Sequence, residues 1–311
     1  MAIKEVPRHT VVERRIEQAL EDMWGRAFDR WHEMYYGDMP LRQGLRELGE
    51  ELADHVAART VPDPALLMAE SRTALLTAAE CALGVLELGC WPDGDFEVHL
   101  PLVSGRLSND ELHYEERWEP AHPATTARTW IDAFAWCVIS GLIGERERVI
   151  GAVLRKDCAP AIRDGVPYST RESVSTPADL ADLADLAEMD ALCGYLTVVQ
   201  GPGPGALPGP APLGKPDTAA RARTAGRLDA AGALTPDQQL LRVLLDDDQG
   251  TFEQALGERL VAYRENAGPD PVPRSLLPVG TVTLAALATQ THGWELGIRS
   301  AYLPESLIRQ H

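Results

Sequence analysis

Residues 274–307 read RSLLPVGTVTLAALATQTHGWELGIRSAYLPESL, and this stretch decides the fold class. Between Leu276 and Ala288, apolar residues surround the whole circumference of the predicted helix, which is typical of a helix buried on all sides. The run breaks at His292-Gly293, and apolar residues then alternate with polar or small ones up to Leu303-Pro304. We therefore expect a core helix followed directly by an extended segment.

Two other stretches, residues 74–88 and 126–143, are similarly apolar and predict two more helices that are buried all round. Apolar residues at helical spacing predict further, amphipathic helices over 12–35, 41–56, 177–196, 236–245 and 251–263. Short connections between consecutive helices favour antiparallel pairs. The expected fold class is mainly α, an irregular multi-helix array of antiparallel helical hairpins with one small β-hairpin.

The β-hairpin is predicted near residues 95–114. Phe96, Val98 and Leu100 alternate with polar residues, Ser104-Gly105 can supply the turn, and Leu107 begins the returning strand. Because two strands alone are marginally stable in water, we expect this hairpin to lie on the helices.

The chain has 311 residues, more than the ~100–200 residues of a usual domain. We expect an N-terminal helical region over 1–200, a Gly/Pro-rich flexible loop over 201–216 and a C-terminal helical region over 217–311. The loop contains GPGPGALPGP, which offers too few apolar side chains to pack. The two helical regions are expected to pack together as one domain.

The first predicted helix carries an aromatic stripe. Trp24, Phe28, Trp31 and Tyr35 recur every three or four residues, so they share one helical face. Such a stripe could bind a ligand, but aromatic residues at this spacing belong to a core far more often. We therefore expect this stripe to be buried.

Composition limits the classes of partner. Asp and Glu number 47 against 29 Lys and Arg, which gives a formal net charge of −18. Nucleic acid and anionic membranes would be repelled by this charge, so a neutral or basic partner is expected. A competing interpretation is that the negative charge only keeps the protein soluble.

The five cysteines form no CxxC pair, and most lie in apolar helical segments, so we interpret them as buried thiols. No secretion signal precedes the first helix, and no apolar run approaches the ~18–20 residues that cross a bilayer. A cytoplasmic location is expected. The bias toward Ala, Arg, Gly and Pro is typical of a GC-rich, actinobacterial genome.

A polar segment over residues 109–122 is the most function-like cluster in the sequence. The carboxylates Glu111, Glu115 and Glu116, with His113 and His122, could bind a metal or transfer a proton. Their spacing matches no known zinc or di-iron signature. An acidic docking loop with Tyr114 or Trp118 as its anchor is a second interpretation, and a solvated loop is the third.

A second acidic cluster is the run Asp246-Asp247-Asp248, at the end of a predicted helix. The alternating ligands of an EF-hand calcium site are missing, so a solvated helix end with local negative charge is favoured. Sequence signatures of a nucleophile elbow, a zinc protease or a phosphate-binding loop are also missing. We assign no catalytic residue, metal or cofactor.

The segment GWELGIRSAYLP at residues 293–304, together with the early Arg8-His9 pair and the order of helices, resembles the immunity 49 family of bacterial polymorphic-toxin immunity proteins. The resemblance implies a helical protein that neutralises a cognate toxin by occluding its active site. Acidity suits a basic toxin, because complementary charge speeds encounter. The candidate partner-binding residues are Glu115, Glu116, Trp118, Asp246, Asp247, Asp248, Arg299 and Tyr302. Arg299 could instead be structural and pair with a carboxylate such as Glu295.

The alternative function is a metal- or small-molecule-dependent enzyme, or a ligand-binding protein of secondary metabolism, with a pocket between the buried helices. The residues expected to line that pocket are His113, Glu116, His292, Arg299 and Tyr302. A third possibility is a scaffold protein whose apolar tail docks a homologous subunit.

Overall fold

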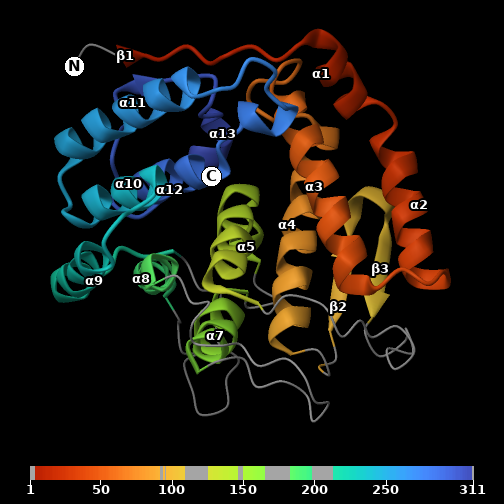
Figure 1. The fold of residues 1–311 in the computed structure, drawn as a ribbon, viewed down its shortest axis with the longest axis horizontal. Helices are drawn as coiled ribbons and strands as arrows, with labels where there is room; N and C mark the ends of the chain where they lie inside the picture. Colours follow the sequence, from red (N-terminus) through yellow and green to blue (C-terminus); the bar gives the residue numbers. More distant parts are fainter. Residues whose placement is uncertain are drawn as a thin grey trace.

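A computed structural model describes residues 4–91, 94, 96–108, 125–145, 150–164, 183–197 and 213–309. The described part is mainly α-helical, which confirms the predicted fold class (Figure 1). Two long helices, α3 (Leu41–Arg59) and α4 (Ala69–Cys90), run antiparallel through the middle, and α5 (Ala127–Ser140) packs on α4. These three helices form the centre of the hydrophobic core.

Helix α4 is buried because it is apolar around its whole circumference, as its sequence predicted. By length and composition alone α4 could cross a membrane, so the expectation that no segment approaches this length was wrong. Most of α4 lies inside the protein, where neighbouring helices replace lipid as its apolar environment. An apolar composition that would suit a membrane-spanning helix therefore also suits a helix in the core of this protein.

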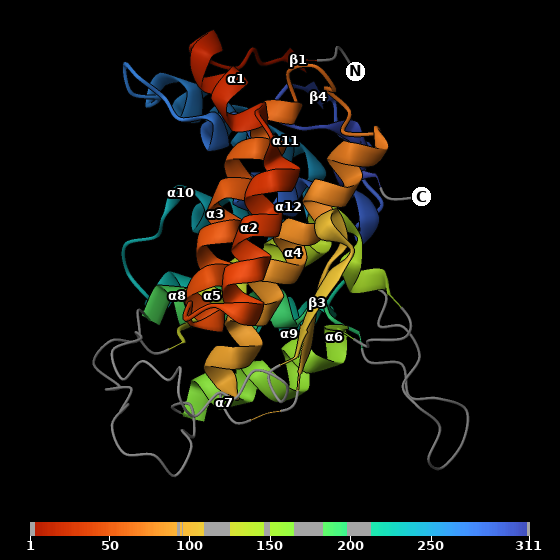
Figure 2. The same cartoon turned by 90° about the vertical axis from the view of Figure 1, so that its right-hand side faces the viewer.

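The N-terminal region forms two helices, α1 (Glu13–Leu20) and α2 (Met23–Tyr36), where the sequence predicted one. The break lies at Asp22, whose backbone adopts a left-handed conformation with φ 37°. The Asp22 carboxylate accepts a hydrogen bond from the Gly25 amide at 3.1 Å and so caps α2. Helix α2 packs beside α3 (Figure 2).

The predicted β-hairpin is confirmed. Strands β2 (Glu97–Leu100) and β3 (Gly105–Ser108) pair antiparallel, with Val98 opposite Leu107, and a short 3-10 turn at Pro101–Val103 joins them. Val98 and Leu107 are buried, because the hairpin lies on α4. A Cβ atom at Gly84 would come within 2.8 Å of Val98, so this close packing needs glycine.

The chain continues from α5 through the 3-10 turn Leu142–Gly144, α6 (Ile150–Ala152), a π-helical segment (Val153–Cys158), α7 (Ala159–Asp164) and α8 (Leu183–Cys193). Leu213 then forms an isolated bridge with Leu196. Most of the predicted flexible loop over 201–216 lies outside the described residues. The proposed division at this loop stays a prediction.

The remaining helices are α9 (Thr218–Ala230), α10 (Pro236–Leu245), α11 (Gln249–Glu265), the 3-10 turn Pro273–Leu276, α12 (Val279–Gln290) and α13 (Glu305–Ile308). Helix α12 is the predicted core helix, and it packs on α5. The C-terminal helices therefore share the core of the N-terminal ones.

A parallel pair of very short strands joins the two ends of the described chain. Strand β1 (Lys4–Glu5) pairs with β4 (Ile298–Arg299) in the predicted extended segment. The Lys4 amide donates to the Gly297 carbonyl and the Val6 amide to the Arg299 carbonyl, both at 2.9 Å. We call this pairing, with the Arg8-His9 contacts described below, the terminal clasp.

Candidate functional site

A polar network that includes one of the predicted site residues surrounds Asp247, which has a left-handed backbone at φ 63°. One carboxylate oxygen lies 2.6 Å from Lys215 Nζ and 3.0 Å from an Arg221 nitrogen. The other oxygen accepts from His292 Nδ1 at 2.8 Å, while Tyr195 Oη lies 3.1 Å from His292 Nε2. We call this set the Asp247 network.

The electrostatics of the network favour an ionised Asp247 beside a neutral His292. Burial by itself raises the pKa of Asp247, but Lys215, His292 and Arg221 together lower it below its ordinary value. Burial lowers the pKa of His292, and Asp247 only partly offsets this. A neutral His292 can donate from Nδ1 to Asp247 and accept at Nε2 from the Tyr195 hydroxyl, whose pKa burial raises.

The two other aspartates of the acidic run also have partners within the chain. Asp246 pairs with Arg242 at 2.5 Å. Asp248 caps α11 by accepting from the Thr251 amide at 2.6 Å, and the hydrogen bonds from Thr251 lower its pKa. Each carboxylate of the run therefore has a role in the fold. Their contact with a partner stays a prediction.

Tyr302 is fully buried and belongs to the terminal clasp. Its hydroxyl oxygen accepts from the His9 amide at 3.0 Å and lies 2.5 Å from His9 Nδ1, while His9 Nε2 lies 2.8 Å from Ser275 Oγ. Burial and the Arg8 charge lower the pKa of His9, which suits a neutral ring that accepts from Tyr302 and donates to Ser275. The geometry gives Tyr302 a structural role.

The neighbouring Arg8 extends the clasp to the core, because its guanidinium donates to Thr60 Oγ1 at 2.6 Å. Arg299, in contrast, has an exposed side chain, and within the described residues it has no ion pair. The suggested bridge to Glu295 is therefore not seen, and Arg299 stays a predicted contact residue.

The alternative pocket is not assembled among the described residues. His292 binds Asp247 and Tyr195, whereas Tyr302 binds His9, so the two side chains belong to separate networks. The predicted site residues His113, Glu115, Glu116 and Trp118 lie outside the described residues. Within the described ranges, no group of three or more His, Cys, Asp and Glu side chains could hold a metal ion.

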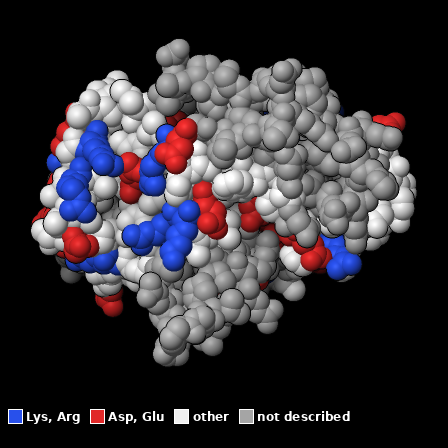
Figure 3. All heavy atoms as spheres, turned by 90° about the horizontal axis from the view of Figure 1, so that it is seen from below, with Lys and Arg blue, Asp and Glu red and all other residues white. Residues whose placement is uncertain are grey.

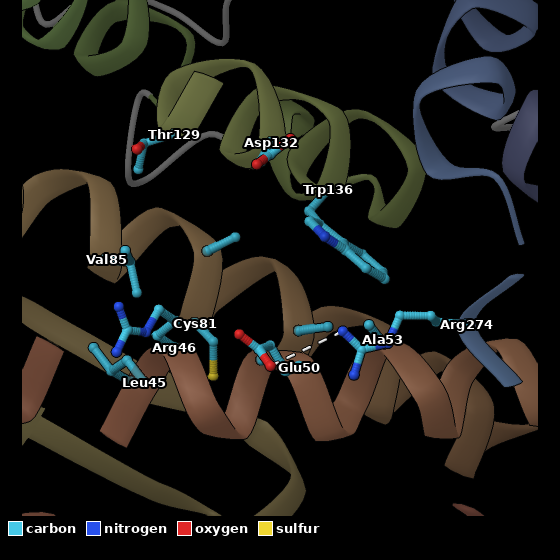
Figure 4. Close-up of a pocket in the computed structure, with 13 residues that line it drawn as sticks. Leu45, Arg46, Glu50, Ala53, Cys81, Val85, Thr129, Asp132, Trp136 and Arg274 are labelled. Atoms are coloured by element: carbon cyan, nitrogen blue, oxygen red, sulfur yellow. Dashed lines mark ion pairs between the residues drawn. The ribbon is translucent and has the colours of Figure 1, made fainter. Parts of the chain in front are cut away.

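A groove of about 410 Å³ runs between α3 and α5, with α4 as its floor (Figure 4). Small side chains make the floor, including Ala78 and Ala82. Trp136 and Asp132 line the α5 side, and Arg46 lines the α3 side. The groove is the closest match to the predicted pocket between buried helices, but it is lined by none of the residues predicted for it.

Asp132 is the acidic group of the groove whose pKa is raised. Its side chain reaches solvent, but partial desolvation between the helices, and to a smaller extent the charge of Asp185, raises its pKa to about 6, although Arg128 opposes this. Arg128 is itself paired with Asp185 and with the buried Glu188, which also accepts from Gln238 at 3.0 Å. Cys81 in the floor is buried, and burial raises its pKa, so its thiol is unreactive.

The aromatic stripe of α2 is the site feature that the sequence interpretation missed. Trp24 is 55% exposed and Tyr36 is 64% exposed, while Phe28, Trp31 and Tyr35 are partly buried. The inner face of α2 instead consists of Met23, Ala27 and Met34. The prediction that this stripe is buried was therefore wrong for Trp24, whereas Met23, Ala27 and Met34, which belonged to the same predicted stripe, are buried. Tyr36 lies outside the predicted stripe.

A signal for the true inner face was present in the sequence. Arg30 has the helical phase of Met23, Ala27 and Met34, and it pairs with Glu47 at 2.8 Å and Glu51 at 3.1 Å on α3. The aromatic row is rotated from that face by about 100°, the turn of one residue in a helix. We call Trp24, Phe28, Trp31, Tyr35 and Tyr36 the α2 strip.

Surface charge is mixed on one large face of the molecule. Seen from below, basic and acidic side chains lie next to each other over the described residues (Figure 3). On the helices at this end, for example, Arg163 and Arg227 both pair with Asp190, at 2.6 and 2.5 Å. Among the described residues of this face, acidic side chains are therefore interspersed with basic ones.

A model of the family described as immunity protein 49 matches residues 63–307, most of the chain. The chain belongs to the immunity protein 49 family. Searches of curated proteins and of solved structures gave no significant match. In this immunity protein 49 family member, the matched range contains the groove floor and the Asp247 network. It begins after α2, so the α2 strip belongs to the part of the chain that the family model does not cover.

Proposed function

We propose that the protein is an immunity protein that neutralises a cognate bacterial toxin by direct contact, in the cytoplasm of the cell that makes it. Membership in the immunity protein 49 family carries this proposal. A net charge of −18 adds to it, because an acidic protein attracts a basic partner and accelerates its association.

The arrangement of the polar groups supports a role in contact. The titratable side chains of the Asp247 network and of the clasp satisfy one another inside the fold. Hydrogen-bonded networks of this kind stiffen a structure, and a stiff frame reduces the entropy lost on binding a partner. Inhibition by occlusion needs such a frame.

The test uses the toxin domain encoded beside the gene for this protein. Expression of that domain in a sensitive host should arrest growth, and co-expression of the full chain should restore it. The two purified proteins should co-elute as a complex on size exclusion. A toxin domain of an unrelated system is the control and should stay active. Unrelieved growth arrest, with both proteins present and folded, would contradict the proposal.

The groove between α3 and α5 favours a second candidate function, the binding of a small molecule. Its small floor residues leave about 410 Å³ beside the indole of Trp136, within the size range of ligand sites. Native mass spectrometry of protein from its own host should then show a bound compound. The variant Ala82→Leu would fill the floor and should lose that compound, whereas Leu183→Ala, at an exposed position on α8, should retain it.

A further inference from the structure

The α2 strip is a continuous row of rings on the outside of the protein. Trp24 stacks on Phe28 with ring centroids 5.3 Å apart, Phe28 contacts Trp31 at 5.6 Å, and Trp31 stacks on Tyr35 at 5.4 Å. From Trp24 to Tyr36 the row is about 18 Å long at 1.5 Å per helical residue. An exposed row of this length offers enough area to anchor a partner.

The rings are held in place before any partner arrives. Trp31 Nε1 donates to the Arg106 carbonyl of strand β3 at 3.1 Å, which fixes the middle of the row to the hairpin. Stacking fixes the neighbouring rings. Rigid aromatic side chains lose little conformational entropy on binding, and for this reason Trp and Tyr dominate interface hot spots.

Helix α2 also exposes carboxylates. Asp29 and Glu33 are exposed and lie one helical turn apart, about 100° or more around the helix from Trp24, Phe28, Trp31 and Tyr35 and closer to the phase of Tyr36. Glu21 and Asp38 extend this charge beyond the two ends of the helix. The arginines of α2 offset this charge only in part: Arg26 and Arg30 both pair with Glu51 on α3, and Arg30 also lies 3.8 Å from Glu33.

We infer that the α2 strip is the docking face for the toxin and that it receives a basic protein surface that presents arginine side chains. The inference rests on the proposed immunity function and names the face and the partner chemistry. Guanidinium groups stack on aromatic rings and bind carboxylates through two parallel hydrogen bonds, so arginine matches both components of this face. Its position outside the matched family range suits contacts that distinguish one toxin from another.

The negative charge of α2 disfavours other partners for the α2 strip. Nucleic acid and anionic lipid would meet the carboxylates of Asp29 and Glu33 with like charge. A second copy of the chain would bring the same acidic residues against each other across a symmetric interface. A basic polypeptide relieves this repulsion.

The experiment measures binding of the purified neighbouring toxin domain to the full chain by biolayer interferometry. The double variant Trp24→Ala/Tyr36→Ala removes the exposed rings and should weaken binding at least about tenfold, mainly through faster dissociation. Its matched control is Leu183→Ala, a 70% exposed apolar side chain on α8, on the other side of the molecule (Figure 1). This control should bind like the wild type.

A second pair of variants tests the carboxylates. Asp29→Asn/Glu33→Gln should slow association and flatten its dependence on salt, because electrostatic attraction steers the encounter. Glu258→Gln/Glu265→Gln removes the same charge from the exposed side of α11, away from α2, and should have a smaller effect. If removal of the rings affects folding, these two charge variants still test the docking face.

The outcomes separate the two proposals. If the wild type and both strip variants bind the toxin domain equally, the docking face is overturned and the immunity function stands. If no form binds an active toxin domain, both are overturned. Ring-dependent binding to phosphatidylcholine vesicles would assign the strip to membranes, and a ring-dependent dimer on light scattering would assign it to self-association. Either result would overturn the inference.

Discussion

The Asp247 network and the α2 strip use polar and aromatic residues in opposite ways. In the network, Asp247 faces inward and binds Lys215, Arg221 and His292. In the strip, the rings of Trp24 and Tyr36 face solvent on a helix that also exposes the carboxylate of Asp29. The acidic run that looks like a binding site is engaged in folding, whereas the stripe that looks like core is available for contact. Whether a side chain is already paired inside the fold, more than its residue type, therefore decides whether it can contact a partner.

The largest effect is expected from Asp247→Asn. Asparagine tolerates the left-handed backbone, but it removes the charge that Lys215 and Arg221 bind. We expect the free energy of unfolding to fall by about 2–3 kcal/mol at pH 7, because two cations lose their partner in a partly buried site. Urea denaturation followed by circular dichroism measures this loss. The neighbouring Asp246→Asn, which breaks an exposed pair with Arg242, should cost at most about 1 kcal/mol.

The effect of Asp247→Asn should also depend on pH. The pKa values of Asp247 and His292 are both below their ordinary values in the folded protein, so both groups stabilise it above those ordinary values and lose the effect as pH falls. The difference between wild type and variant should therefore persist from pH 7 to about pH 4 and shrink below about pH 4, where Asp247 becomes protonated. A difference that does not shrink as pH falls below about 4 would contradict the ionised pairing.

The next largest effect is expected from Asp248→Ala. Its carboxylate caps α11 through the Thr251 amide, and because loss of an N-cap destabilises a helix, the urea midpoint should fall. Asp248→Ser retains a capping oxygen and is the matched control. If the two variants have the same urea midpoint, the cap is not the reason for any loss.

A smaller change in stability, this time a gain, is expected from Asp132→Asn in the groove. Because partial desolvation raises the pKa of Asp132 to about 6, this residue supports the fold below its ordinary pKa and loses that contribution as pH rises through about 6. The variant should therefore melt about 1–2 °C higher than wild type at pH 7.5, since solvent screening keeps the gain small. At pH 4 the two melting temperatures should coincide.

The smallest effect on stability is expected from Trp24→Ala/Tyr36→Ala. Both rings are more than half exposed, so their removal should change the free energy of unfolding by about 0.5 kcal/mol or less. Urea denaturation alongside Asp247→Asn measures the contrast. A loss as large as that of Asp247→Asn would show that the strip stabilises the fold, and the comparison between the two regions would fail.

Much of the fold could be predicted because the decisive signal was local. The all-round apolar composition of α4, α5 and α12 predicted burial correctly, since such helices have no face that suits water. The hairpin was predicted from strict alternation around Val98 and Leu100 and from a turn at Ser104-Gly105. In each case a few neighbouring residues determine the element.

The rest depended on contacts between distant segments. Periodicity placed the rings of α2 on one face but did not determine which neighbour covers that face, and α3 covers the adjacent one through Glu47 and Glu51. One partner of Asp247 is His292, which lies just beyond the end of α12 and is separated from Asp247 in the chain by α11 and α12. Local sequence patterns do not reveal a contact over this distance. Strand β1 has two residues, too few for any alternation.

The terminal clasp constrains the order in which the protein can be completed during synthesis. Strand β1 is made long before its partner β4 and the Tyr302 hydroxyl that holds His9, because His9 and Tyr302 are 293 residues apart in the chain. Strand β1 must therefore stay unpaired until β4 has been made, and closure of so large a loop carries a high entropic cost. We expect the clasp to form after the helical core and its amide hydrogens to exchange before those of α4.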